Sequence, residues 1–71
     1  MIYHLEFQSN IDGRDLVVVD EYRLVERILK IVSAFRKAGY DVSGSFHRTA
    51  SRFFGEYQFK NNQETVSMSI V

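Results

Sequence analysis

One stretch of the chain, residues 20–38, has the periodicity of an amphipathic helix, and this constrains the fold more than any other feature. Its apolar residues recur at three- and four-residue steps: Leu24, Ile28, Ile31, Val32 and Phe35, with Val25 and Leu29 widening the stripe. Asp20 is suited to cap the start, and Gly39 is suited to follow the last turn. We therefore expect one helix that buries a single face.

Alternation of apolar and polar residues in the rest of the chain predicts half-buried strands, and the β-branched run at residues 15–19 also favours a strand. The expected strands are residues 1–8, 15–19, 41–49, 52–60 and 65–71. Turn signals separate them at Asp12-Gly13, at residues 49–51 and at Asn61-Asn62, since asparagine tolerates a positive φ. The sequence predicts one α+β domain over residues 1–71, with one amphipathic helix packed on an antiparallel sheet, in the order ββαβββ and in two layers.

Composition narrows the classes of function. The chain has 71 residues, no Cys and only two His, which argues against disulfides, a zinc site or another bound cofactor. Nine basic and nine acidic residues give zero net charge, whereas a dedicated nucleic-acid binder usually has a basic excess. Zero net charge also lowers the barrier to self-association. Because neither a signal-peptide pattern nor a membrane-length apolar run is visible, we expect a cytoplasmic protein with no membrane partner.

The segment RFFGEYQF, residues 52–59, has an unusual density of aromatic side chains. In a strand, Phe53, Tyr57 and Phe59 share one face, and Phe54 and Glu56 share the other. Three rings in phase on a strand are typical of a core that faces a helix. We therefore predict that these three rings are buried and that Phe54 is exposed.

The same segment resembles the RNP1 strand of the RNA-recognition-motif family at Arg52, Phe54, Gly55 and Phe59. The resemblance implies binding of single-stranded nucleic acid, with a base stacked on Phe54. The basic residues that would accompany this role are Arg48, Arg52 and Lys60, together with His47. Glu56 stands where the family has its second stacking ring, and the chain leaves no room for the family's second helix. Single-stranded nucleic-acid binding is therefore the alternative hypothesis.

The segment GSFHR, residues 44–48, resembles the histidine-bearing strand of the HicA-type toxin ribonucleases. The resemblance implies acid–base chemistry by His47 on RNA. Here two predicted strands precede the helix, and Phe46 interrupts the family's Gly-Ser-His pattern. Paired carboxylates, an activated nucleophile and a glycine-rich phosphate loop are all missing from the sequence. We therefore expect no enzyme activity and name no catalytic residue.

Binding without chemistry is the main hypothesis. The last predicted strand ends at Val71 and is expected to leave an open sheet edge, which favours pairing with another chain. Ser67 and Ser69 on that strand, together with Phe54 and Tyr22, are the expected partner-binding residues. The prediction is a small protein-interaction module, either a homodimer or a domain that docks on a protein partner. By analogy of size, it would be an accessory factor of a phage or mobile element that binds and modulates a host protein.

Overall fold

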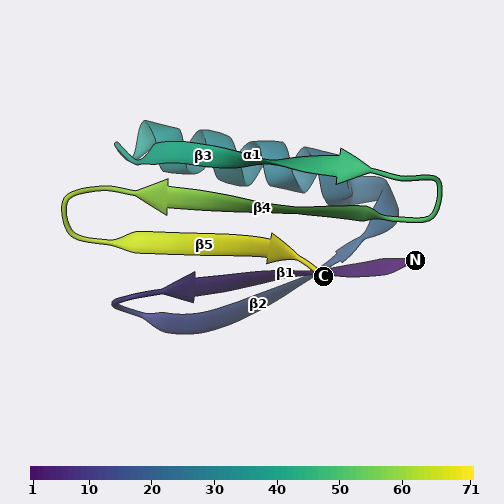
Figure 1. The fold of residues 1–71 in the computed structure, drawn as a ribbon, viewed down its shortest axis with the longest axis horizontal. Coiled ribbons are helices and arrows are strands. Elements are labelled where there is room, and N and C mark those ends of the chain that lie inside the picture. Colours follow the sequence, from purple (N-terminus) through teal and green to yellow (C-terminus); the bar gives the residue numbers. More distant parts are fainter.

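A computed structural model describes residues 1–71 as five strands and one α-helix (Figure 1). The elements are β1 (Ile2–Ser9), β2 (Gly13–Asp20), the 3-10 turn η1 (Glu21–Arg23), α1 (Leu24–Lys37), β3 (Asp41–Arg48), β4 (Phe53–Lys60) and β5 (Thr65–Ile70). The predicted α+β class and the order ββαβββ are confirmed. The main difference in bounds is at the helix, which starts with the 3-10 turn and becomes α-helical only at Leu24.

All five strands belong to one antiparallel sheet with the order β2-β1-β5-β4-β3. The predicted open edge on the last strand is therefore wrong, because β5 lies between β1 and β4. The central place suits its sequence, since Val66, Met68 and Ile70 are all buried on one side of the strand. The two open edges of the sheet are β2 and β3.

One buried hydrophobic cluster contains residues of α1 and residues that share one face of the sheet, and we call that face the inner face. Helix residues Leu24, Ile28 and Val32 belong to one buried cluster with sheet residues Tyr3, Leu5, Val19, Phe59, Val66, Met68 and Ile70. Val25 and Leu29 were expected to widen this stripe, but they are exposed. At about 100° per residue they lie to one side of the buried stripe, so α1 contacts the sheet through a narrower face.

Asp20 caps the 3-10 turn η1 that precedes α1, whose own N-cap residue Arg23 forms no side-chain cap, and Gly39 follows the last turn as predicted. The Asp20 side chain accepts a hydrogen bond from the Tyr22 N–H at 2.7 Å. Gly39 has φ +92°, and the Tyr40 N–H donates to the Phe35 carbonyl across it at 3.0 Å. This closing bond is typical of a helix that ends at glycine.

The turn at Asn61-Asn62 forms by a different mechanism from the one expected. No residue other than glycine has a positive φ, so asparagine's tolerance of that region is not used. Instead, the Asn61 side-chain oxygen accepts from the Gln63 and Glu64 N–H groups at 2.9 and 2.7 Å. The turn between β3 and β4 uses the same device, with the Thr49 hydroxyl accepting from the Arg52 N–H.

Two glycines allow aromatic side chains to lie across the inner face of β3 and β4. Gly44 pairs with Tyr57, and Gly55 pairs with Phe46. A Cβ atom on Gly44 would lie 2.2 Å from the backbone oxygen of Glu56, and one on Gly55 would lie 2.6 Å from the Cα of Phe46. Neither position has room for a side chain, so both ladder pairs require glycine.

Candidate functional site: the outer face of the sheet

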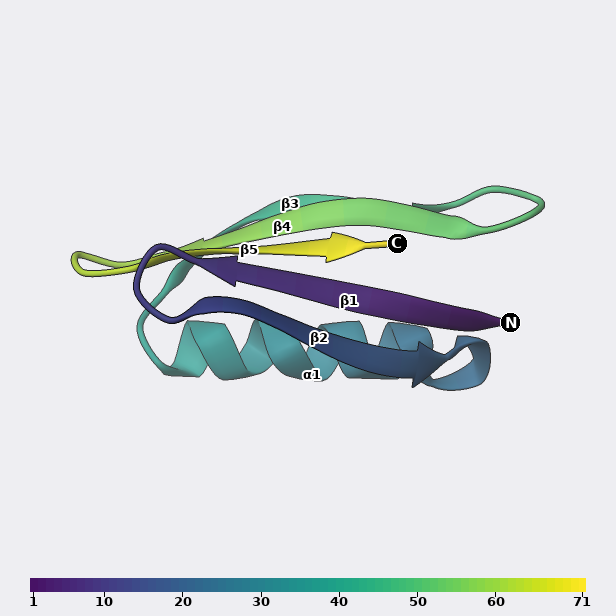
Figure 2. The same cartoon turned by 90° about the horizontal axis from the view of Figure 1, so that it is seen from below.

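The face of the sheet on the side away from α1, here called the outer face, is not covered by the helix (Figure 2). Side chains alternate between the two faces along each strand, so every outer-face residue is next in sequence to one that points to the core. The side chains of the outer face are Ile2, His4, Glu6 and Gln8 from β1; Arg14, Leu16, Val18 and Asp20 from β2; Asp41, Ser43, Ser45 and His47 from β3; Phe54, Glu56, Gln58 and Lys60 from β4; and Thr65, Ser67 and Ser69 from β5.

The middle of the outer face is polar and acidic. Ser69 on the central strand pairs with Glu6 on one side and Glu56 on the other. Ser67 likewise lies between two glutamines, Gln8 and Gln58. Short side chains between longer ones make this band shallow, and its two carboxylates oppose the approach of phosphate groups.

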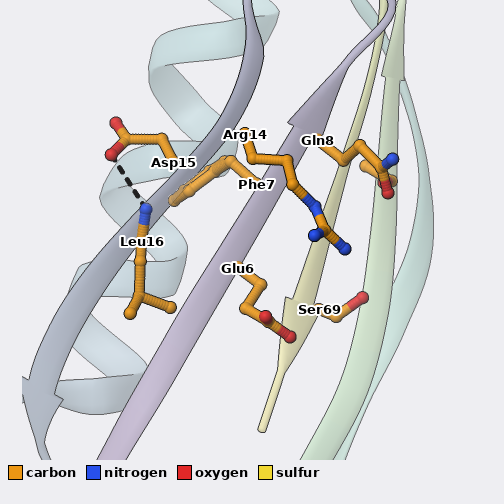
Figure 3. Close-up of a pocket in the computed structure, with 8 residues that line it drawn as sticks. Glu6, Phe7, Gln8, Arg14, Asp15, Leu16 and Ser69 are labelled. Carbon is orange, nitrogen blue, oxygen red and sulfur yellow. Dashed lines mark hydrogen bonds between the residues drawn. The ribbon is translucent and has the colours of Figure 1, made fainter.

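A depression of about 370 Å³ opens over β1 and β2 at the side of this band (Figure 3). The Arg14 side chain extends over it toward Glu6 and Gln8 (Figure 3). Arg14 forms no hydrogen bond and no ion pair, and the one ion pair of the structure joins Lys30 to Glu26 on α1 at 3.0 Å. Arg14 is therefore a cation without a fixed partner beside the acidic middle of the outer face.

Apolar and imidazole side chains form a row at one end of the outer face. In ladder order this row contains Val18, His4, Val71, Phe54 and His47. Phe54 and Val71 are 39% and 54% exposed, which is high for an aromatic ring and a branched aliphatic side chain. Large exposed apolar groups that adjoin one another are typical of interaction sites.

His47 lies at the end of this row, on the edge strand β3. Its ring centroid is 5.5 Å from that of Phe54, and its Nε2 lies 3.1 Å from the Ser45 hydroxyl. No carboxylate holds the imidazole, and nowhere do three His, Asp or Glu side chains gather closely enough to bind a metal ion. The surroundings of His47 are therefore those of a surface contact residue.

The predicted partner-binding residues are only partly brought together. Phe54, Ser67 and Ser69 share the outer face, and the two serines are half-buried between longer neighbours. Tyr22 is 91% exposed, but it lies in η1 and so outside the outer face. Tyr22 therefore does not belong to the same surface as Phe54.

The basic residues named for the nucleic-acid alternative, whose arrangement the sequence leaves open, do not form one patch. Arg48 lies over the ring of Phe53 at 5.5 Å, and Phe53 packs against the core on the inner face. Lys60 follows Arg52 by eight positions along β4, so at ~3.4 Å per residue their backbones are ~27 Å apart.

The three rings predicted to be buried all lie on the inner face. Phe59 is fully buried, whereas Phe53 and Tyr57 are half-buried and pack against the core from the side. The sequence reasoning did not single out Arg14, Leu16 or Val18 on β2 as surface features. Part of the signal was available, since side chains point alternately to the two faces of any strand, so Arg14, Leu16 and Val18 must share one face.

The chain matches no protein-family model, and no curated protein matches it in sequence. The single α-helix is neither long enough nor apolar enough to cross a lipid bilayer.

Proposed function

We propose that this chain is a small non-enzymatic protein-interaction module that binds a protein partner through the outer face of its sheet. In this proposal the helix and the sheet form two layers, so that the sheet's outer side stays free for the partner. The observation that carries the proposal is the row of exposed apolar groups around Phe54 and Val71 at one end of that face. Aromatic and aliphatic groups at the centre of an interface supply most of its binding free energy.

Charge placement favours a protein over a nucleic acid as the partner. Glu6 and Glu56 lie in the middle of the outer face, where a bound strand would place its phosphates. Arg48 stacks on the inner-face ring of Phe53, and so it is not beside the ring that would stack a base. The partner surface that complements this face has an apolar ridge next to basic or hydroxyl groups.

The chain's small size fits the role of an accessory factor of a phage or mobile element, acting in the cytoplasm on a host protein. Such a factor needs a binding face but no catalytic group. This setting determines where to look for the partner, namely among the proteins of the host cell.

A site-specific cross-linking experiment tests the proposal. A photoreactive residue is placed at Phe54, and the matched control places it at Lys30, whose side chain is 73% exposed on α1. We expect one discrete protein adduct from Phe54 and none from Lys30. Unlabelled wild-type protein should compete for the adduct, and Phe54→Ser should compete roughly tenfold less well or worse, as expected for an aromatic interface residue.

Two results would contradict the proposal. Equal, diffuse labelling from both positions would show that Phe54 is an ordinary surface residue. Labelling of nucleic acid from Phe54, with retention on short single strands at ~50 mM salt, would instead favour the nucleic-acid alternative.

A further inference from the structure

The open edge of β2 has a pattern of charges and apolar groups that is complementary to itself in antiparallel orientation. Along the outer-face side of β2 the residues are Arg14, Leu16, Val18 and Asp20, in that order. When a second copy of β2 lies antiparallel beside the first, Arg14 of one copy lies opposite Asp20 of the other, and Leu16 lies opposite Val18. We propose that two copies of the chain pair through their β2 edges and form one continuous antiparallel sheet.

The backbone of β2 is oriented for this pairing. His4 of β1 exchanges both backbone hydrogen bonds with Val71, at 2.9 Å each, so its N–H and C=O groups face away from β2. Val18, the register partner of His4, therefore has its own N–H and C=O groups turned to the free edge. The same alternation turns the backbone groups of Leu16 outward, and its N–H is held only by the neighbouring Asp15 carboxylate at 2.8 Å.

One register of the pairing is selected by charge. With Val17 opposite Val17 of the second copy, both Arg14 side chains lie opposite an Asp20. A shift of the register by two residues in one direction places Arg14 opposite Val18, and a shift in the other direction places Asp20 opposite Leu16. Both shifts lose the two pairs of opposite charge, which stabilise paired strands, so these alternatives are disfavoured.

A second charge match lies on the inner side of the same edge. Val19 and Asp20 line a depression of about 350 Å³ together with Arg23 and Arg27, and neither arginine has an ion-pair partner. In the proposed register, Asp15 of the second copy lies opposite Val19 and so at the mouth of this depression. Both sides of the seam therefore place an unpaired arginine near a carboxylate of the other copy.

The other open edge, β3, is a poorer candidate. Gly44, near its middle, has φ +110°, which is outside the extended region of a regular strand. After Gly13, β2 has no residue with a positive φ. An isologous pair of β2 edges also closes the assembly at two copies, whereas pairing β2 with β3 is head-to-tail and gives a ring or an open filament.

Charge reversal tests this dimer, with mass measured by sedimentation across micromolar to millimolar concentrations. The wild type should dimerise. R14D places two carboxylates opposite each other at both ends of the seam, and D20R places two arginines there, so each should raise the dimer Kd about tenfold or more. An equimolar mixture of R14D and D20R should recover a dimer, because every facing pair is then opposite in charge.

Asp20 also caps the 3-10 turn that precedes the helix, so D20R could weaken the fold itself. Amide hydrogen exchange on the wild type avoids this problem. The Leu16 and Val18 amides should become more protected as concentration rises, while the Gly44 and Phe46 amides of β3 should not change. A wild type that stays monomeric, an R14D variant as dimeric as the wild type, or protection that rises only in β3 would each overturn the proposal.

The dimer does not depend on the proposed partner-binding role, because Phe54 lies on β4, three strands away from β2. A monomeric R14D variant that still cross-links through Phe54 would separate the two. Neither proposal predicts that an R14D variant that remains dimeric would lose the cross-link through Phe54.

Discussion

The two faces of β4 are built from alternate residues of one eight-residue strand, and they differ sharply. Phe53, Tyr57 and Phe59 point to the inner face and pack on the core. Phe54, Glu56 and Gln58 point to the outer face and are exposed. The segment that resembles a base-binding strand therefore places three of its four rings on the inner face, where Phe59 is fully buried and Phe53 and Tyr57 are half-buried.

The inner face owes its stability to a connected series of rings. Phe35 of α1 stacks on Phe59 at 4.0 Å, and Tyr57 lies 6.2 Å from Phe59. At the other end of β4, Phe53 meets Tyr3 edge to face at 5.8 Å. The Tyr3 hydroxyl also accepts the Phe53 N–H at 2.9 Å, so this end is fixed by a hydrogen bond as well as by packing. Whether an aromatic-rich strand forms part of a core or a binding surface thus depends on what covers each of its faces. Its amino-acid composition alone is compatible with both roles.

The largest expected effect separates the two faces directly. Phe59→Ala removes a fully buried ring beneath α1 and should lower the free energy of unfolding by about 3–5 kcal/mol. The adjacent outer-face change Gln58→Ala should stay within about 0.5 kcal/mol. Urea unfolding of both variants measures the difference. Similar losses at the two positions would mean that the outer face is also covered in solution.

A smaller effect is expected where the inner face depends on glycine. Gly44→Ala forces a side chain into a φ of +110° and against the backbone of β4. Backbone strain of this kind costs about 1–3 kcal/mol, and the close contact adds to that cost. Ser43→Ala, one residue earlier on the outer face, is the matched control and should be nearly neutral. If thermal unfolding shows Gly44→Ala to be as stable as Ser43→Ala, the close pairing with Tyr57 is not required.

Much of this arrangement could be predicted from the sequence because it depends on local patterns. Alternation and helical periodicity located the five strands, the helix, Asp20 before it and Gly39 after it, since each is determined by residues a few positions apart. The same parity argument places Arg48 on the inner side of β3 with Val42 and Phe46. Applying it would have removed Arg48 from the expected phosphate-binding set.

The order of the strands could not be predicted in the same way. The position of β5 between β1 and β4 depends on which strands, far apart in the sequence, bury the most apolar surface when they pair. Alternation gives every strand a similar inner face, so it does not distinguish between these pairings. The edge was therefore assigned to β5 when it belongs to β2 and β3. The exposure of Val25 and Leu29 has a similar origin, because the width of the helix contact depends on the position of β3.

The smallest expected effect concerns the one carboxylate that is held among inner-face groups. Glu64 accepts hydrogen bonds from the Ser9 hydroxyl at 2.6 Å and from the Tyr40 hydroxyl at 2.5 Å. It thereby joins three turns of the chain, and Tyr40 in turn packs edge to face on Phe35 at 4.9 Å. The bond from Ser9, followed by that from Tyr40, lowers the pKa of Glu64 below its usual value. The bond to Glu64 raises the pKa of Tyr40 above its usual value.

These two shifts give the pH dependence of stability a definite sign. A lowered carboxyl pKa stabilises the fold above the unfolded value of about 4.3, and this contribution is lost as pH falls through the folded pKa. A raised tyrosine pKa stabilises the fold below about 10, and this contribution is lost as pH rises further. Glu64→Gln keeps a similar shape without a charge. Thermal unfolding between pH 2 and 5 should therefore show that its stability falls less steeply with decreasing pH than that of the wild type.

Glu26→Gln is an informative control, since the pKa of Glu26 is also lowered. The cause is its bond to Lys30 on the exposed side of α1, where solvent screens the charges. If Glu26→Gln reduces the loss of stability at low pH as much as Glu64→Gln does, the inner-side hydrogen bonds of Glu64 contribute no more to stability than a surface ion pair.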